Sequence, residues 1–88
     1  MNMDQALETM ELLVIFMEEC AEASVEASKV IRFASDTSTS IPPLEREVGD
    51  LLCMVELLKE YNLINSEEVE RAKEAKREKL KKWSNLNV

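Results

Sequence analysis

Two groups of acidic side chains are the residues of this sequence best suited to chemistry. The first group holds Glu18, Glu19 and Glu22, and the second holds Glu47 and Asp50, with 24 residues between the groups. Carboxylates three residues apart lie on one side of a helix, about 4.5 Å apart along its axis. Ligand sets made only of oxygen favour Mg²⁺ or Mn²⁺ over zinc, copper or iron. Because proteins usually hold Mg²⁺ by a few carboxylates and substrate phosphates, the pattern predicts a phosphorylated substrate.

The position of the second group makes it the more informative one. On a helical projection of residues 44–61, Glu47 and Asp50 fall inside the apolar stripe, while other charged residues occupy the opposite side. We therefore expect both carboxylates to point into the core. A buried ionised carboxylate must be paired, protonated or bound to a cation. The chain has no histidine, and no inward arginine is placed to pair with both acids, so a divalent metal is the simplest partner.

The first group, taken alone, is typical of a solvated helix face. Glu18, Glu19 and Glu22 share a sector about 100° wide with further acids, and apolar residues lie across from it. The further acids of this sector are Glu8, Glu11 and Glu26. The second group changes this interpretation, because its inward acids need a partner and the preceding helix is the neighbour of similar length. The residues of that helix expected on its apolar side are Leu13, Phe16, Met17, Cys20, Ala27 and Ile31.

The two acidic patterns, Glu-Glu-x-x-Glu and Glu-x-x-Asp, resemble the signature of the MazG-like all-α nucleoside triphosphate pyrophosphohydrolases. The resemblance covers roughly residues 10–62 and depends on five acids at fixed spacing within apolar helices. It implies Mg²⁺-dependent hydrolysis of a nucleoside triphosphate to a monophosphate and pyrophosphate, with Glu18 as an accessory ligand or water-orienting base. The metal would neutralise charge at the attacked phosphorus and activate water. The metal ligands that the resemblance implies are Glu19, Glu22, Glu47 and Asp50.

Length and composition predict one small all-α domain over residues 1–88. Hydrophobic residues make up 45% of the chain and charged residues 33%, with one glycine and two prolines, which is a helical composition with little turn material. The net charge of −7 argues against nucleic-acid binding, which needs a basic surface. We see neither a membrane-spanning apolar run nor a signal peptide, so we expect a cytoplasmic protein. Cys20 and Cys53 are expected to be buried, reduced thiols.

Three helical segments are expected within this domain. The segment between the first two helices is filled with small polar residues and ends in Pro42 and Pro43, which block helix continuation and suit a new start. Ser38, Thr39 or Ser40 either contacts the nucleotide or belongs to a plain flexible connector. The expected segments are a helix at about 4–33, a loop at 34–43, a helix at about 44–62 and a helix at about 66–84.

The third helix begins with a capping-box pair, Asn65 and Glu68, and carries cations in an unusual place. Lys76 projects into its thin apolar stripe and Lys73 lies at the edge of that stripe. These lysines either snorkel to solvent or, together with Arg77, meet the distal phosphates of the substrate. The stripe itself consists of Val69, Ala72, Leu80 and Trp83.

The apolar sectors of the first two helices are wider than one chain of this length can cover. We therefore expect a homodimer or homotetramer whose helices form a four-helix-type bundle, and MazG-like enzymes are similar assemblies. Two other interpretations stay open. One is a non-catalytic helical oligomerisation or interaction module with a vestigial acidic cluster. The other is a di-iron or di-manganese carboxylate bundle, which usually needs Glu-x-x-His pairs that this chain lacks.

Overall fold

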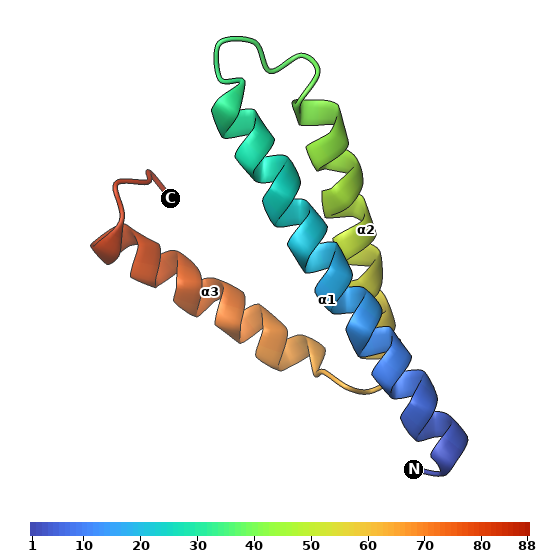
Figure 1. Ribbon diagram of the computed structural model, residues 1–88. Helices are drawn as coiled ribbons and strands as arrows, with labels where there is room; N and C mark the ends of the chain where they lie inside the picture. The colour runs from blue at the N-terminus through green and yellow to red at the C-terminus, as the bar shows by residue number, and fades with distance from the viewer.

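Three α-helices make up the whole fold. A computed structural model describes all 88 residues, in the order α1 (Met3–Arg32), α2 (Ile41–Glu60) and α3 (Ser66–Trp83). Figure 1 shows α1 and α2 side by side as an antiparallel hairpin, while α3 diverges from them. The expected all-α fold with a helical hairpin and a third helix is confirmed. No helix combines the length and the apolar character needed to cross a membrane.

The beginning of α2 differs from the sequence expectation. This helix begins at Ile41, so Pro42 and Pro43 belong to its first turn rather than to the preceding loop. Proline fits there because the first-turn N–H groups have no partner within a helix, and its fixed φ angle suits helical backbone. The start of α3 follows the expectation: the Asn65 side chain accepts hydrogen bonds from the backbone N–H groups of Glu67 and Glu68.

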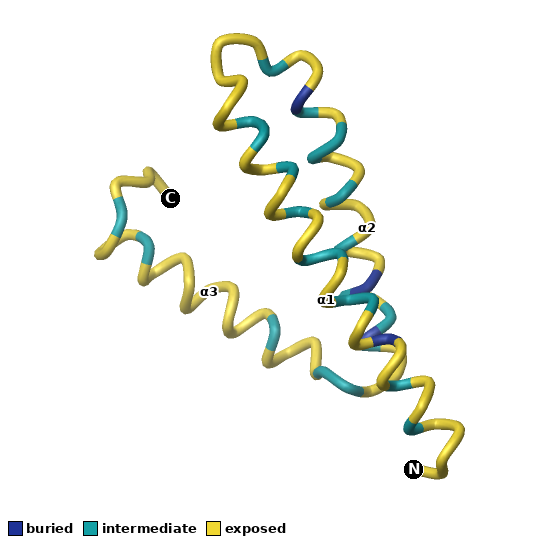
Figure 2. Tube along the Cα trace, viewed as in Figure 1, coloured by how far each residue is buried: buried dark blue, intermediate teal, exposed yellow.

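The hydrophobic core is small and lies between α1 and α2. Its buried members are Leu12, Met54 and Leu58, and the residues after α2 help to cover them. Figure 2 shows that most of the chain, including nearly all of α3, is exposed. A core this thin leaves the hairpin with little apolar stabilisation of its own. Partly buried residues around the core are Ile15, Phe16, Leu57, Leu63 and Ile64.

The face of α1 that packs on α2 matches the predicted one only in part: Phe16 and Cys20 are half-buried, and Phe16 packs against the core. Leu13, Met17 and Ile31 were expected to face the core, but they are 42%, 66% and 77% exposed. The face toward α2 instead includes Leu12 and Glu19. α1 carries apolar residues around more than half of its circumference, so hydrophobic periodicity did not determine which part α2 covers.

A row of large apolar side chains therefore remains on the outside of α1. Its members recur at alternating spacings of four and three residues, the pattern of a helix that packs against another helix. Each of them is more than half exposed. The row consists of Met3, Leu7, Met10, Val14 and Met17.

One cysteine and most apolar residues of α3 also lie outside the core. Both thiols are free, but only Cys20 is half-buried and Cys53 is exposed, so the expectation of two buried thiols was wrong for Cys53. Trp83 at the end of α3 is almost fully exposed. The apolar stripe of α3 is thus left largely open within one chain.

We predict that Leu58→Ala lowers the free energy of unfolding by about 2–3 kcal/mol, because it opens a cavity in a core that has few other contacts. Leu58 is 4% exposed, whereas Cys53 on the same helix is exposed and serves as the control. Cys53→Ala should cost less than about 1 kcal/mol. Urea unfolding followed by circular dichroism measures both. An equal loss at Cys53 would contradict this assignment of the core.

Candidate metal centre

Three of the five acids singled out by the sequence converge on one point between α1 and α2. Glu19 comes from the middle of α1, and Glu47 and Asp50 come from successive turns of α2. One carboxylate oxygen from each lies within 4.8 Å of the other two. Opposite ligands of an octahedral Mg²⁺ lie about 4 Å apart, at about 2.0–2.1 Å from the ion. Neighbouring ligands of such an ion lie about 3 Å apart. The three oxygens would therefore move closer together to share one cation.

Burial leaves one oxygen in each of two of these carboxylates without a hydrogen-bond partner. Glu19 and Glu47 are half-buried, and the Oε2 atom of each is shielded from solvent and accepts no hydrogen bond. In native proteins nearly all buried polar atoms form hydrogen bonds. The two Oε2 atoms therefore indicate that a binding partner is missing. Asp50 is exposed and forms the rim of the cluster. The expectation of an inward carboxylate was thus right for Glu47 and wrong for Asp50.

Crowding of negative charge changes the protonation of the cluster. The neighbouring Glu47 carboxylate, which can share a hydrogen with Glu22, raises the pKa of Glu22, and the charges of Glu18 and Asp50 add to this effect. Burial raises the pKa of Glu47. The hydrogen bond with Glu22 acts against this rise, while Glu19 and the charge of Asp50 add to it. Each fully ionised arrangement is therefore unfavourable without a cation.

The other residues predicted from sequence take different places. Glu22 lies beside Glu47 but does not belong to the group of three converging oxygens. Glu18 is exposed next to this group. Glu26, which the sequence placed among the solvated acids, is half-buried instead. Its spacing of seven residues from Glu19, two helical turns, was the available signal that both share one face.

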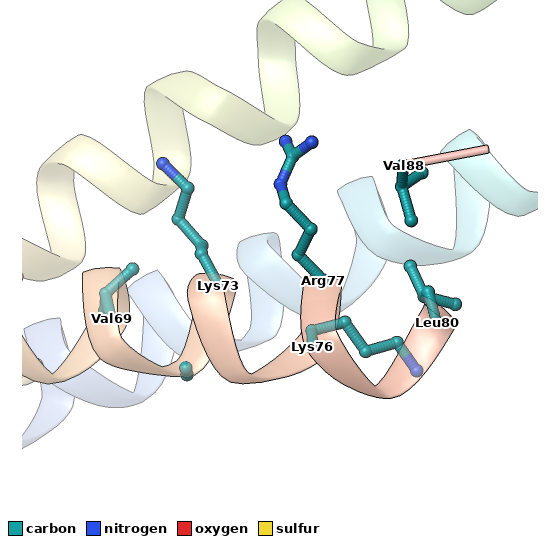
Figure 3. A pocket seen from close by; sticks show the side chains of 7 residues that line it. Val69, Lys73, Lys76, Arg77, Leu80 and Val88 are labelled. Atoms are coloured by element: carbon teal, nitrogen blue, oxygen red, sulfur yellow. The ribbon is translucent and has the colours of Figure 1, made fainter. Parts of the chain in front are cut away.

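The cations of α3 are not brought to the acidic cluster within one chain. Lys73, Lys76 and Arg77 line a separate surface cavity of about 570 Å³, together with apolar residues of α3 and the C-terminal Val88 (Figure 3). In this view Lys73 and Arg77 extend from one side of α3, whereas Lys76 runs along the helix toward Leu80. Any action of these cations on the cluster requires another chain or a movement of α3.

Comparisons with protein families, with curated proteins and with solved structures find no match for this chain. The resemblance to the MazG-like enzymes therefore stays a prediction carried by the acidic pattern. The geometry contributes an independent fact: α1 and α2 bring the two halves of that pattern together.

We predict that Glu47→Gln raises the melting temperature of the metal-free protein at pH 7, and that this gain shrinks toward pH 4. A carboxyl whose pKa is raised by folding stabilises the protein below its ordinary pKa, and this contribution is lost as pH rises through the raised value. Glutamine stays neutral, so it removes that loss. Thermal unfolding in the presence of a chelator, from pH 4 to pH 8, measures the effect.

Glu45→Gln is the matched control, because Glu45 lies exposed on the same helix and its substitution changes the net charge equally. Glu45→Gln should give little pH-dependent increase in the melting temperature. The same gain in both variants would mean that overall charge, and not the cluster, sets the pH dependence.

Proposed function

We propose that this protein is a Mg²⁺-dependent nucleotide pyrophosphohydrolase that cleaves a nucleoside triphosphate to a monophosphate and pyrophosphate. The observation that carries this proposal is the convergence of Glu19, Glu47 and Asp50, with buried oxygens that lack any partner. An all-oxygen site of this kind suits Mg²⁺, or Mn²⁺ in its place. The acidic pattern that resembles the MazG-like enzymes supplies the reaction.

The proposal assigns the acidic residues to two roles, metal binding and activation of water. Glu19, Glu47 and Asp50 would hold the cation, and Glu22 would join them once the cation has displaced its proton. A bound Mg²⁺ supplies positive charge for the phosphate oxygens and for the charge that develops at the attacked phosphorus. Glu18, which is exposed and directly precedes Glu19, would orient the attacking water and accept its proton.

A second copy of the chain is part of this proposal. Viewed along the helix axes, Leu13 of α1 and Val48 and Leu52 of α2 lie on the side of the hairpin opposite Glu22 and Asp50. These apolar residues are exposed in the single chain. Packing two hairpins through this side would complete a four-helix-type bundle, as a homodimer or as half of a homotetramer, and leave the acids open to substrate.

Partner chains also offer a route for the cations of α3. Seven of the chain's 11 lysines and arginines lie in this helix. Lys73 pairs with Glu70, but Lys76 and Arg77 form no ion pair within the chain. We assign Lys73, Lys76 and Arg77 to the distal phosphates of a nucleotide bound by the partner's acids, where positive charge would offset what the metal does not.

The proposed partners and cellular compartment are inferred from the net charge and the two thiols. A net charge of −7 argues against nucleic acid as a partner, so the nucleotide substrate and copies of the same chain are the proposed partners. Two free cysteines suit a reducing compartment, and we assign the protein to the cytoplasm.

The second candidate function is a non-catalytic helical oligomerisation module with a vestigial acidic cluster. It is favoured by the exposed apolar row on α1, from Met3 to Met17, which suits association with another helix and needs no substrate. Such a module would fold and associate in the same way with or without Mg²⁺. Its response to metal therefore separates it from the enzyme.

We predict that Mg²⁺ or Mn²⁺ raises the melting temperature and supports hydrolysis of a nucleoside triphosphate, and that Asp50→Asn lowers kcat/KM at least about 100-fold. Asp50→Asn removes a metal ligand and relieves repulsion among the acids, so the metal-free variant should stay folded. A nucleotide panel with product identification by chromatography measures turnover. Exposed Glu56 on the same helix provides the control Glu56→Gln.

Early products should be a nucleoside monophosphate and pyrophosphate. Release of orthophosphate from the γ position would contradict the pyrophosphohydrolase assignment, even if the metal bound. A melting temperature indifferent to millimolar metal would favour the non-catalytic module.

We predict that Lys76→Ala lowers kcat/KM for triphosphates at least about tenfold while it changes the free energy of unfolding by less than about 0.5 kcal/mol. Lys79→Ala, which removes a cation from the same helix outside the cavity, is the control. If Lys76 acts in a partner's site, mixing Lys76→Ala with inactive Asp50→Asn should restore one intact site per mixed dimer. Steady-state assays of the mixture measure this. Activity equal to the mean of the two variants would contradict action between chains.

A further inference from the structure

The cavity on α3 has the length and lining of a groove for another helix. Its volume is about 570 Å³, and its lining residues on α3 extend from Val69 to Leu80, three helical turns or about 16 Å along the axis. Most of its lining surface is apolar, and Lys73 and Arg77 extend along one side (Figure 3). No residue of α3 is buried within its own chain. Grooves that bind an amphipathic helix receive apolar side chains at intervals of three and four residues.

The exposed row on α1 meets this requirement. Its members, from Met3 to Met17, alternate spacings of four and three residues, and each is more than half exposed. On a helical projection the row lies opposite Leu12, the α1 residue that is buried against α2. Exposed acids follow the row along one edge, whereas the other edge carries uncharged residues. The acids are Asp4, Glu11 and Glu18, and the uncharged residues are Ala6, Leu13 and Cys20.

α3 carries the positive charge that complements this acidic edge. It has seven lysines and arginines against five glutamates, a net charge of +2, while the rest of the chain carries −9. In the groove, Lys73 pairs with Glu70, but Lys76 and Arg77 form no ion pair. Charges at the edges of a helix pair determine partner and orientation. α3 is therefore complementary to the α1 row in its apolar stripe and in its charge.

A second α1 helix fits the row less well. Two α1 helices packed antiparallel would bring their acidic edges together, and like charges repel there. Two α1 helices packed parallel would set each acidic edge against the uncharged edge of the other, where no cation neutralises it. The charge pattern of the row thus favours α3 as its occupant.

The charge pattern also requires that the two helices run in opposite directions. Glu18 follows the row residue Met17 by one position. Arg77 follows Lys76 of the α3 stripe in the same way, so both charges lie on the same rotational side of their stripes. Such edges meet only when the helices are antiparallel. Within one chain, α3 runs in the same general direction as α1 (Figure 1). The complementary α3 therefore belongs to a second copy.

One alignment centres the groove on the row. With Leu80 opposite Met10, the exposed Trp83 also meets an apolar residue of the row. The three cations of the groove then face the stretch of α1 between Glu11 and Glu18. In this alignment each helix covers apolar side chains of the other and neutralises part of its charge.

We propose that the α1 row of one copy docks antiparallel in the α3 groove of a second copy, and that the two copies exchange this contact reciprocally. A dimer with two-fold symmetry makes such a contact twice. The docking itself does not depend on catalysis. Its link with the metal centre rests on the proposed function: Lys73 comes level with Met17, next to Glu18 and Glu19, and so lies near the acidic cluster of the second copy.

Disulfide cross-linking between chains tests this contact without metal or nucleotide. The full-length chains carry Cys20→Ala and Cys53→Ala, so that each has a single introduced thiol. Met10→Cys mixed with Leu80→Cys should give at least about fivefold more disulfide-linked dimer than Met17→Cys mixed with Leu80→Cys. The second pair is out of alignment by seven residues, about 10 Å along the axis.

Two further mixtures identify the occupant. Glu56→Cys, at an exposed position of α2, is mixed with Leu80→Cys to measure random encounters. An equal yield from this pair, or a larger yield of Met10→Cys linked to itself, would overturn the assignment of α3 to the row. A chain with both Met10→Cys and Leu80→Cys, diluted into an excess of cysteine-free chains, should lose its cross-link. A cross-link retained within that chain would overturn the second copy as the occupant.

Charge reversal across the contact gives an independent test in solution. Arg77→Glu should raise the dissociation constant of the dimer at least about tenfold, and Glu11→Lys in the same chain should restore it to within about threefold of the wild type. Lys82→Glu makes the same change of charge on the far side of α3 and should alter the constant less than about threefold. Sedimentation equilibrium measures all four proteins. A monomeric wild type, or no restoration by Glu11→Lys, would overturn the docking.

The docking surface and the proposed reaction can fail independently. If the cross-link forms and the charge reversal is restored but no triphosphate is hydrolysed, the docking surface stands and the reaction is wrong. If triphosphate is hydrolysed by a protein that gives neither result, the reaction stands and the docking surface is wrong.

Discussion

The contact between α1 and α2 is built around carboxylates that it cannot satisfy by itself. Glu19 and Glu47 each place one oxygen out of reach of water and of any donor, at the middle of a hairpin with only three buried apolar residues. Apolar burial at about 25 cal/mol per Å² gives such a core little surplus to offset unpaired charge. We therefore expect the hairpin to be most stable when the cluster carries a proton or the proposed cation.

This constraint links the fold to the chemistry. The raised pKa values of Glu22 and Glu47 show that the cluster holds protons more tightly than separate carboxyls do. The proposed divalent cation would compete for the same oxygens and would also supply the charge that a phosphate needs. The feature that weakens the metal-free hairpin is thus the feature that would make it a phosphate-binding site.

The sequence predicts the elements of this fold better than their contacts. Asn65 marks the beginning of α3 through local capping, and the inward position of Glu47 follows from its place among the leucines of α2. The contacts of α1 could not be predicted from the sequence, because its apolar residues surround most of the helix and α2 covers only one side. Asp50 was misplaced for a related reason: a residue about 60° from the centre of a stripe lies at its rim. The burial of Glu26 and Ser40 was not predicted, because it depends on how two helices meet.

The exposed surfaces extend the same argument beyond one chain. A row of apolar side chains on α1, the apolar side of α2 and the basic α3 are all left open, while the acids gather on one side of the hairpin. Apolar surface of this extent marks an interaction site in most proteins. In the proposed assembly, the hairpin of a second copy would cover the exposed apolar side. The α3 helix of that copy would bring cations to the acids. This assembly would explain the small core, because most of the apolar surface that stabilises the protein would be buried between chains rather than within one.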